Sequence, residues 1–223
     1  MHSAPAALSL AQPAHPNRQY DNLYLSHGHR EYFVPDSFVI QQSTVFVGHA
    51  MDVELHAREA FEKTTGVEFP ENIIITVGTK AQLKQVHESR AGRWDDSIVG
   101  FSLNGQSVRP HEVFVLEGSL DRVMLTLGHE IGHVLSPTLP DMRDEEAKAF
   151  AFSLAWIRTI VDHNIAGLSN CINPNPAKNG LHDVAFSFVS DKLKEGHQPL
   201  SLFKQLKMQE VSIRQKLETI ILN

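Results

Sequence analysis

The feature that most constrains this chain is a pair of histidines four residues apart inside a segment with helical periodicity. Residues 120–135 carry apolar side chains at helical spacing and stop before two prolines, which predicts a helix that ends there. An HExxH sequence occupies residues 129–133 of this segment. Because residues four apart share one face of a helix, the imidazoles of His129 and His133 can reach a single metal ion. The segment therefore predicts a metal-binding helix.

Glu130 gives this predicted metal site a chemical role. It lies about 100° round the helix from His129. From there its carboxylate can take a proton from a metal-bound water without ligating the metal itself. Zinc polarises a scissile carbonyl and lowers the pKa of the water, and Glu130 then acts as general base. The motif thus predicts hydrolysis that depends on Zn²⁺, with a degenerate or structural histidine pair as the alternative.

A third metal ligand has to come from elsewhere in the chain, because catalytic zinc sites usually have three protein ligands and one open position. The metzincin extension needs a glycine and a further histidine soon after the motif, and residues 134–141 contain neither. The nearest carboxylates are Asp141, Asp144, Glu145 and Glu146, at the start of a second predicted helix. Their positions on that helix decide between them.

A helical wheel for residues 144–161 selects Glu146. With Ile157 at the centre of the apolar face, Glu146 falls about 20° from that centre at 100° per residue. Asp144, Glu145 and Lys148 fall on the polar face, where Asp144 and Lys148 can pair at i, i+4. A carboxylate on an apolar face needs its charge compensated, and zinc would do that. Glu146 is therefore the predicted third ligand, with a buried ion pair as the alternative.

Residues 127–135, followed by residues 144–151, resemble the active-site region of the ImmA/IrrE-like metallopeptidases. In that family an HExxH helix is paired with a carboxylate-bearing helix that often reads Ala-x-x-Phe-Ala. The resemblance covers about residues 123–155, and it is also compatible with other gluzincins, including lethal-factor-like toxin domains. This sequence departs from the family at Lys148, where the family commonly has Asn or Asp.

The resemblance implies a zincin-like zinc endopeptidase, a metalloprotease whose peptide or protein substrate lies as an extended strand along the edge of the sheet. Residues 98–103 are the candidate edge. The family pattern Ala-x-x-Phe-Ala begins at Ala147 in this sequence. If the third ligand is placed three positions before that alanine, as the resemblance implies, it is Asp144 instead of Glu146. The helical wheel is preferred because an aspartate side chain is one methylene shorter than a glutamate side chain, and because the match to the family pattern is loose. The choice among Asp144, Glu145 and Glu146 stays open.

The order of predicted elements is typical of an α+β fold, with a small mixed sheet packed on helices. Residues 73–77 are a continuous β-branched run, which predicts a central strand buried on both faces. The other predicted strands are residues 97–101 and 113–116, with less regular extended segments at 32–34 and 37–47. Helices are predicted at residues 50–65, 79–88, 120–135, 144–161, 183–195 and 201–222.

Three segments divide the chain. Residues 1–19 are rich in Ala, Pro and His and are expected to be a flexible leader. Residues 20–165 hold the zincin-like catalytic domain that the resemblance implies. Residues 166–223 form a helical C-terminal extension, which is expected to pack on the catalytic domain because apolar helical stripes mostly serve their own core.

Composition excludes several classes of partner. The formal net charge is −6 and no dense Lys/Arg cluster occurs, so nucleic acid is not an expected partner. No apolar stretch approaches the roughly 20 residues that cross a bilayer, so a soluble protein without a membrane partner is expected. A single cysteine, Cys171, excludes an intrachain disulfide framework and a cysteine-based zinc site. It fits a reducing cytoplasm, with a secreted protease free of disulfides as the alternative.

Two functions from other classes remain beside a general endopeptidase. One is a zincin-fold protein that binds metal or regulates a partner without proteolytic turnover. The other is a regulator protease specific for one protein partner. A hydrogen-bond donor to the transition state is also expected. Spacing does not choose among its candidates, which are the arginines, His111, His163, His182, Tyr20, Tyr24 and Tyr32.

Overall fold

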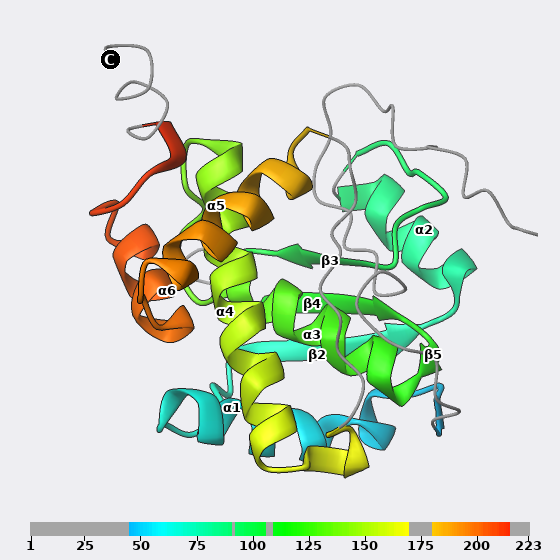
Figure 1. Ribbon diagram of the computed structural model, residues 1–223. Coiled ribbons are helices and arrows are strands. Elements are labelled where there is room, and N and C mark those ends of the chain that lie inside the picture. The colour runs from blue at the N-terminus through cyan, green and yellow to red at the C-terminus, as the bar shows by residue number, and fades with distance from the viewer. Residues whose placement is uncertain (1–44, 91, 106–108, 170–179, 215–223) are drawn as a thin grey trace, which may run out of the picture.

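The computed structural model describes residues 45–90, 92–105, 109–169 and 180–214. The predicted leader, the extended segment at 32–34 and nearly all of the one at 37–47 lie outside these residues. The helices are α1 (Glu54–Thr65), α2 (Lys80–Arg90), α3 (Leu120–Val134), α4 (Met142–Asp162), α5 (His182–Lys194) and α6 (Pro199–Lys207). The strands are β1 (Phe46–Val47), β2 (Ile73–Gly78), β3 (Gly100–Leu103), β4 (His111–Leu116) and β5 (Gly118–Ser119). Short 3-10 turns occur at Ala50–Asp52 and Ile165–Gly167, and the predicted α+β class is confirmed (Figure 1).

Three strands form a mixed sheet in the order β2-β4-β3. β4 pairs in parallel with β2 and antiparallel with β3, so the predicted small mixed sheet is confirmed. The prediction that residues 73–77 are the central strand is wrong, because β4 lies between the other two. The β-branched run suggested burial on both faces, yet Ile74 is 47% exposed. β3 lies at the other edge of this sheet and begins at Gly100 rather than Ser97.

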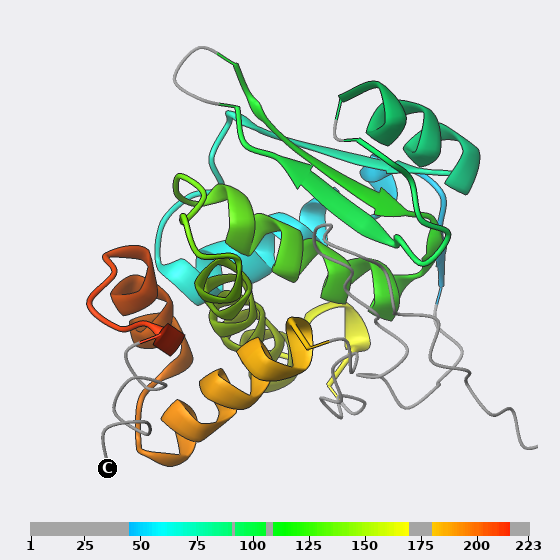
Figure 2. The same ribbon diagram turned by 90° about the horizontal axis from the view of Figure 1, so that it is seen from above.

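The sheet separates two layers of helix. α2 lies on one face, while α3 runs across the other and is backed by α1 and α4 (Figure 2). The side chains of β4 alternate accordingly: Val113 and Val115 join the large core under α3, whereas Phe114 joins a smaller core with Leu83 of α2. This arrangement packs α3 against β3 and β4.

Helices α3 and α4 approach closely because two glycines of α3 face α4. A Cβ on Gly128 would lie 2.5 Å from Cδ1 of Trp156, and a Cβ on Gly132 would lie 2.9 Å from Cα of Ala149. The indole of Trp156 donates to the carbonyl of Met124 at 2.9 Å, which fixes its ring beside α3. This contact brings the first turns of α4 opposite the HExxH residues of α3.

Replacement of Gly128 by alanine should destabilise the protein. Alanine gains about 1 kcal/mol of helix propensity over glycine. The added methyl group nevertheless meets the ring of Trp156, which is fully buried, and overpacking of this kind typically costs about 1–3 kcal/mol or more. Urea unfolding should show a net loss for Gly128→Ala. Gly118→Ala is the control, because a Cβ there meets nothing within 4 Å, and equal stability of Gly128→Ala and wild type would contradict the close contact.

Helices α5 and α6 both pack on α4, and their residues Val189, Leu202 and Leu206 are completely buried in the main core. The helix predicted at 201–222 is wrong in length, because α6 ends at Lys207 and Gln209 has a left-handed φ of 56°. Residues 215–223 lie outside the described part of the chain. Among the described residues, no helix is both long and apolar enough to span a membrane.

Candidate metal centre

His129, His133 and Glu146 come together in the interior of the molecule, where α3 meets the first turns of α4. The Nε2 atoms of His129 and His133 lie 3.2 Å apart. Glu146 Oε2 is 3.4 Å from Nε2 of His129, and its Oε1 is 3.7 Å from Nε2 of His133. The three side chains are 0%, 5% and 1% exposed, and together they form a group that could hold a metal ion.

The donor set fits zinc. Zinc binds imidazole nitrogen and carboxylate oxygen at about 2.0–2.2 Å, so the ligand atoms of a tetrahedral site lie about 3.4 Å apart. The three distances between these side chains fall near that value. Both carboxylate oxygens of Glu146 are buried and have no hydrogen-bond partner within the described residues. A buried carboxylate in this state needs a compensating positive charge, which a metal ion supplies.

Asp144, which the family resemblance suggested as the third ligand, does not lie at the histidine pair. Its carboxylate accepts hydrogen bonds from Oγ of Ser212 and from the backbone N–H of Ile213, both at 2.7 Å. Asp144 therefore ties the start of α4 to the segment after α6. Of Asp144 and Glu146, only Glu146 lies beside the Nε2 atoms of both histidines.

Glu145 and Lys148 are not on a polar face, so this part of the wheel prediction is wrong. Glu145 is 2% exposed and Lys148 is completely buried. Glu145 Oε1 lies 2.7 Å from Nδ1 of His133, and Oε2 accepts from the Leu139 backbone N–H at 2.8 Å. The ammonium group of Lys148 pairs with Glu145 at 2.9 Å instead of with Asp144.

This buried network fixes the orientation of His133. Burial raises the pKa of Glu145, but the hydrogen bond with His133 and the nearby charge of Lys148 outweigh it and lower the pKa overall. Glu145 is therefore an anion that accepts from Nδ1–H, which leaves the lone pair of Nε2 directed at the metal position. Lys148 also donates to the His133 carbonyl at 3.2 Å and to Oγ of Ser136 at 3.1 Å, which ties the end of α3 to α4.

Removal of the Lys148 charge should therefore cost stability. Lys148→Met leaves the Glu145 carboxylate buried beside His133 without its cation, and breaking a buried pair in this way costs about 3–5 kcal/mol. The double variant Glu145→Gln/Lys148→Met removes both charges and should recover part of that loss in urea unfolding. Lys84→Met is the control, since Lys84 is half exposed and its pairing with Glu88 at 3.9 Å contributes little. A Lys148→Met variant as stable as the control would contradict the network.

Glu130 lies on α3 between the two histidines and is 0% exposed. Its side chain extends toward the edge strand β3, because a Cβ on Gly100 would lie 3.3 Å from Glu130 Cγ. The same Cβ would meet Cγ2 of Thr126, so only glycine fits at this position of β3. The predicted general base thus lies next to Gly100 of the edge strand.

His182 is a further buried side chain at this centre, and spacing alone did not single it out. It comes from the first residue of α5 and is 1% exposed. Its Nε2 lies 3.3 Å from Glu146 Oε2. Burial lowers the pKa of His182, partly opposed by the charge of Glu146, and burial also lowers the pKa of His129 well below its usual value. Burial thus favours the neutral form of both rings.

The other candidates for a transition-state donor are placed less favourably or not described. Nδ1 of His111 accepts from the Gly105 backbone N–H at 3.1 Å, so His111 holds the start of the β3–β4 connection. His163 caps the C-terminus of α4 and is exposed. The three tyrosines lie outside the described residues.

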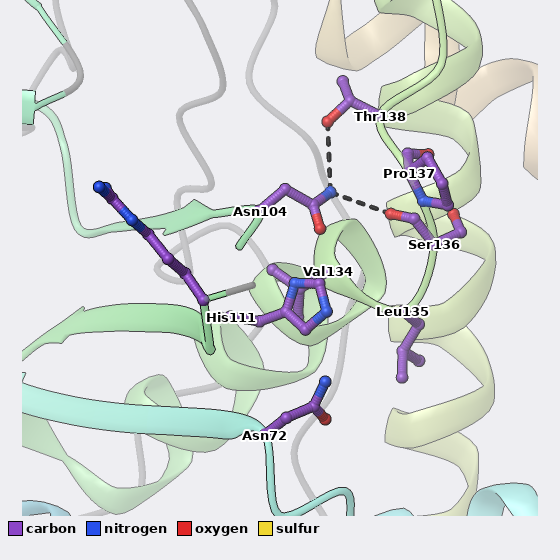
Figure 3. Close-up of a pocket in the computed structure, with 9 residues that line it drawn as sticks. Asn72, Asn104, His111, Val134, Leu135, Ser136, Pro137 and Thr138 are labelled. Carbon is purple, nitrogen blue, oxygen red and sulfur yellow. Dashed lines mark hydrogen bonds between the residues drawn. The ribbon is translucent and has the colours of Figure 1, made fainter. Parts of the chain in front are cut away.

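A pocket of about 850 Å³ opens beside the C-terminal end of α3 (Figure 3). Figure 3 shows Asn104 reaching from the end of β3 toward Ser136 and Thr138. Its amide donates to the Ser136 carbonyl at 2.9 Å, to Thr138 Oγ1 at 3.2 Å and to the His133 carbonyl at 3.3 Å. Asn104 therefore anchors the edge strand to the end of the HExxH helix.

Comparisons with protein-family models, with curated proteins and with solved structures found no match to this chain.

Proposed function

We propose that this protein is a zincin-like zinc endopeptidase of the gluzincin kind, in which His129, His133 and Glu146 hold the metal and Glu130 is the general base. The observation that carries the proposal is the buried His–His–Glu group on α3 and α4 with a second buried carboxylate, Glu130, directed at the edge strand. The resemblance of residues 123–155 to ImmA/IrrE-like metallopeptidases supports it.

Each residue has a defined part in hydrolysis. Zinc, when bound, polarises the scissile carbonyl and lowers the pKa of a water molecule. Glu130 takes a proton from the attacking water and returns it to the departing amine. Glu145 keeps His133 in the tautomer whose Nε2 can bind metal, and Lys148 balances the charge of Glu145.

The edge strand β3 supplies a place for the substrate. In the sheet of the described residues, β3 is hydrogen-bonded to β4 on one side only. A peptide can extend such a sheet by main-chain hydrogen bonds, which fits a substrate bound as an extended strand. The Glu130 side chain lies next to Gly100 of that strand, so a peptide bound there would pass near the predicted base.

Burial of the centre favours a second candidate, a metal-binding or regulatory protein without proteolytic turnover. His129 and Glu130 are 0% exposed in this structure. A peptide bond has to reach the metal before it can be hydrolysed, so an enzyme must open this centre, whereas a protein that only binds metal need not.

A cleavage screen separates these functions. Purified protein is incubated with a complex peptide library and with casein, with and without a zinc chelator, and new termini are identified by mass spectrometry. An endopeptidase produces new termini that disappear with chelator and return with added zinc. Zinc binding with no new termini from any peptide or protein substrate would favour the second candidate. Cleavage of one protein with casein left intact would identify a regulator protease.

A further inference from the structure

The C-terminal segment contributes a side chain to the metal centre. His182 begins α5, which lies 49 positions after the second histidine of the HExxH sequence and outside the region of family resemblance. Its ring is 1% exposed and packs edge-on against Phe150 of α4 at a centroid distance of 6.0 Å. Phe150 in turn packs edge-on against both His129 and Phe186. These rings hold His182 beside Glu146.

Glu146 has one oxygen on the His133 side and one that lies near two other imidazoles. Oε2 is 3.4 Å from Nε2 of His129 and 3.3 Å from Nε2 of His182. His182 is not part of the compact group of possible ligands, which consists of His129, His133 and Glu146. It lies instead against Oε2 of Glu146, at the distance expected for a partner of the ligating carboxylate.

Ligating carboxylates are usually hydrogen-bonded to a second group that fixes their rotamer and keeps the metal bound. An imidazole N–H can donate to a carboxylate, and Nε2 of His182 lies 3.3 Å from Oε2 of Glu146. That distance allows such a bond once the N–H is aligned with this oxygen, which accepts no hydrogen bond from the described part of the chain. We propose that His182 is a positioning residue, which donates from Nε2 to Oε2 of Glu146 and so holds the third ligand toward the metal. The inference rests on the metal site of the proposed function.

The proposal makes zinc affinity depend on a residue that does not touch zinc. Loss of a partner of this kind typically weakens metal binding about 10–100-fold. His182→Leu keeps an apolar side chain packed against Phe150 but removes the donor. His182→Gln keeps a donor, because its amide nitrogen reaches about as far from the backbone as Nε2. The pair of variants separates hydrogen bonding from packing.

The experiment is a competition titration of the full-length apoprotein with zinc and a chromophoric chelator. We expect His182→Leu to bind one zinc per chain with about 10–100-fold lower affinity, and His182→Gln to stay within about fivefold of wild type. His87→Leu is the control. His87 is equally buried, at 6% exposed, but packs against Trp94 and Phe101 on the other side of the sheet, so its loss should leave zinc affinity unchanged.

Three results would overturn this proposal alone. Wild-type affinity in His182→Leu would show that His182 has no role at the metal. Equal weakening in the leucine and glutamine variants would show that only packing matters. Three imidazoles at zinc by X-ray absorption, instead of two, would make His182 a ligand. A wild-type protein that binds no zinc would overturn both this proposal and the proposed function, whereas the first three results would leave the proposed function standing.

Discussion

Glu130→Gln should bind zinc as wild type does and lose hydrolysis. Glutamine has nearly the same shape as glutamate, so the buried position between α3 and β3 stays filled, but its amide cannot accept the proton of the attacking water. General-base catalysis contributes about 10²–10⁴-fold, so cleavage of any peptide found in the screen should fall by about that factor. Zinc content is measured by metal analysis and cleavage by mass spectrometry of the same protein sample.

The control for this prediction is Glu117→Gln, the same chemical change at a partly exposed position beyond the end of β4. It should leave both zinc content and cleavage unchanged. A Glu130→Gln variant that cleaves at the wild-type rate would remove Glu130 from proton transfer. One that loses its zinc would make Glu130 part of the metal site itself.

Glu146→Ala should release zinc, while Asp144→Ala should keep it. Alanine at 146 deletes one of three ligands, so zinc affinity should fall by more than the roughly 10–100-fold that the loss of a second-sphere partner costs. Asp144→Ala removes the contacts to Ser212 and Ile213, which should lower the free energy of unfolding with little effect on zinc. Dialysis against a weak chelator followed by metal analysis compares the two variants directly.

His129→Ala and His133→Ala are the reference variants for zinc loss, because each also deletes one proposed ligand. All three ligand variants should lose most of their zinc under the same dialysis. If Asp144→Ala lost its zinc and Glu146→Ala kept it, the third ligand would be Asp144, as the family resemblance suggested.

The parts of this molecule that follow from local periodicity could be predicted from the sequence. The spacing of His129 and His133 placed both rings on one helical face, and the structure has them 3.2 Å apart. The wheel centred on Ile157 directed Glu146 inward, and Glu146 is 1% exposed beside the histidines. In both cases the side chain faces a single neighbouring surface, so its angular position on the helix is enough to predict where it points.

Where several elements meet, periodicity was not enough. α4 is covered by α1, α3, α5 and α6, so its supposed polar face is also interior, and Lys148 is buried with Glu145. The connection between α3 and α4 brings Leu139 and Ser136 to that face. A helical wheel cannot predict these contacts, because it contains no information about the position of a loop. His182 depends on how α5 packs against α4, a long-range contact that leaves no mark in the local sequence.

The same limit applies to the sheet. The run at 73–77 has the composition of a central strand, but β4 pairs with both β2 and β3, which places β4 in the middle. The order of strands in a sheet depends on which strands pair with each other. The composition of one strand does not show which distant strand it pairs with.

Zinc reconstitution tests the central claim most directly. Zinc is removed from the purified protein with a chelator, and cleavage of a peptide identified in the screen is then measured as zinc is added back. Cleavage should be absent in the apoprotein, should rise in proportion to added zinc and should level off at one zinc per chain, while Glu130→Gln binds the same amount without cleaving. Cleavage that persists in the apoprotein, or one bound zinc with no cleavage of any substrate, would contradict the account.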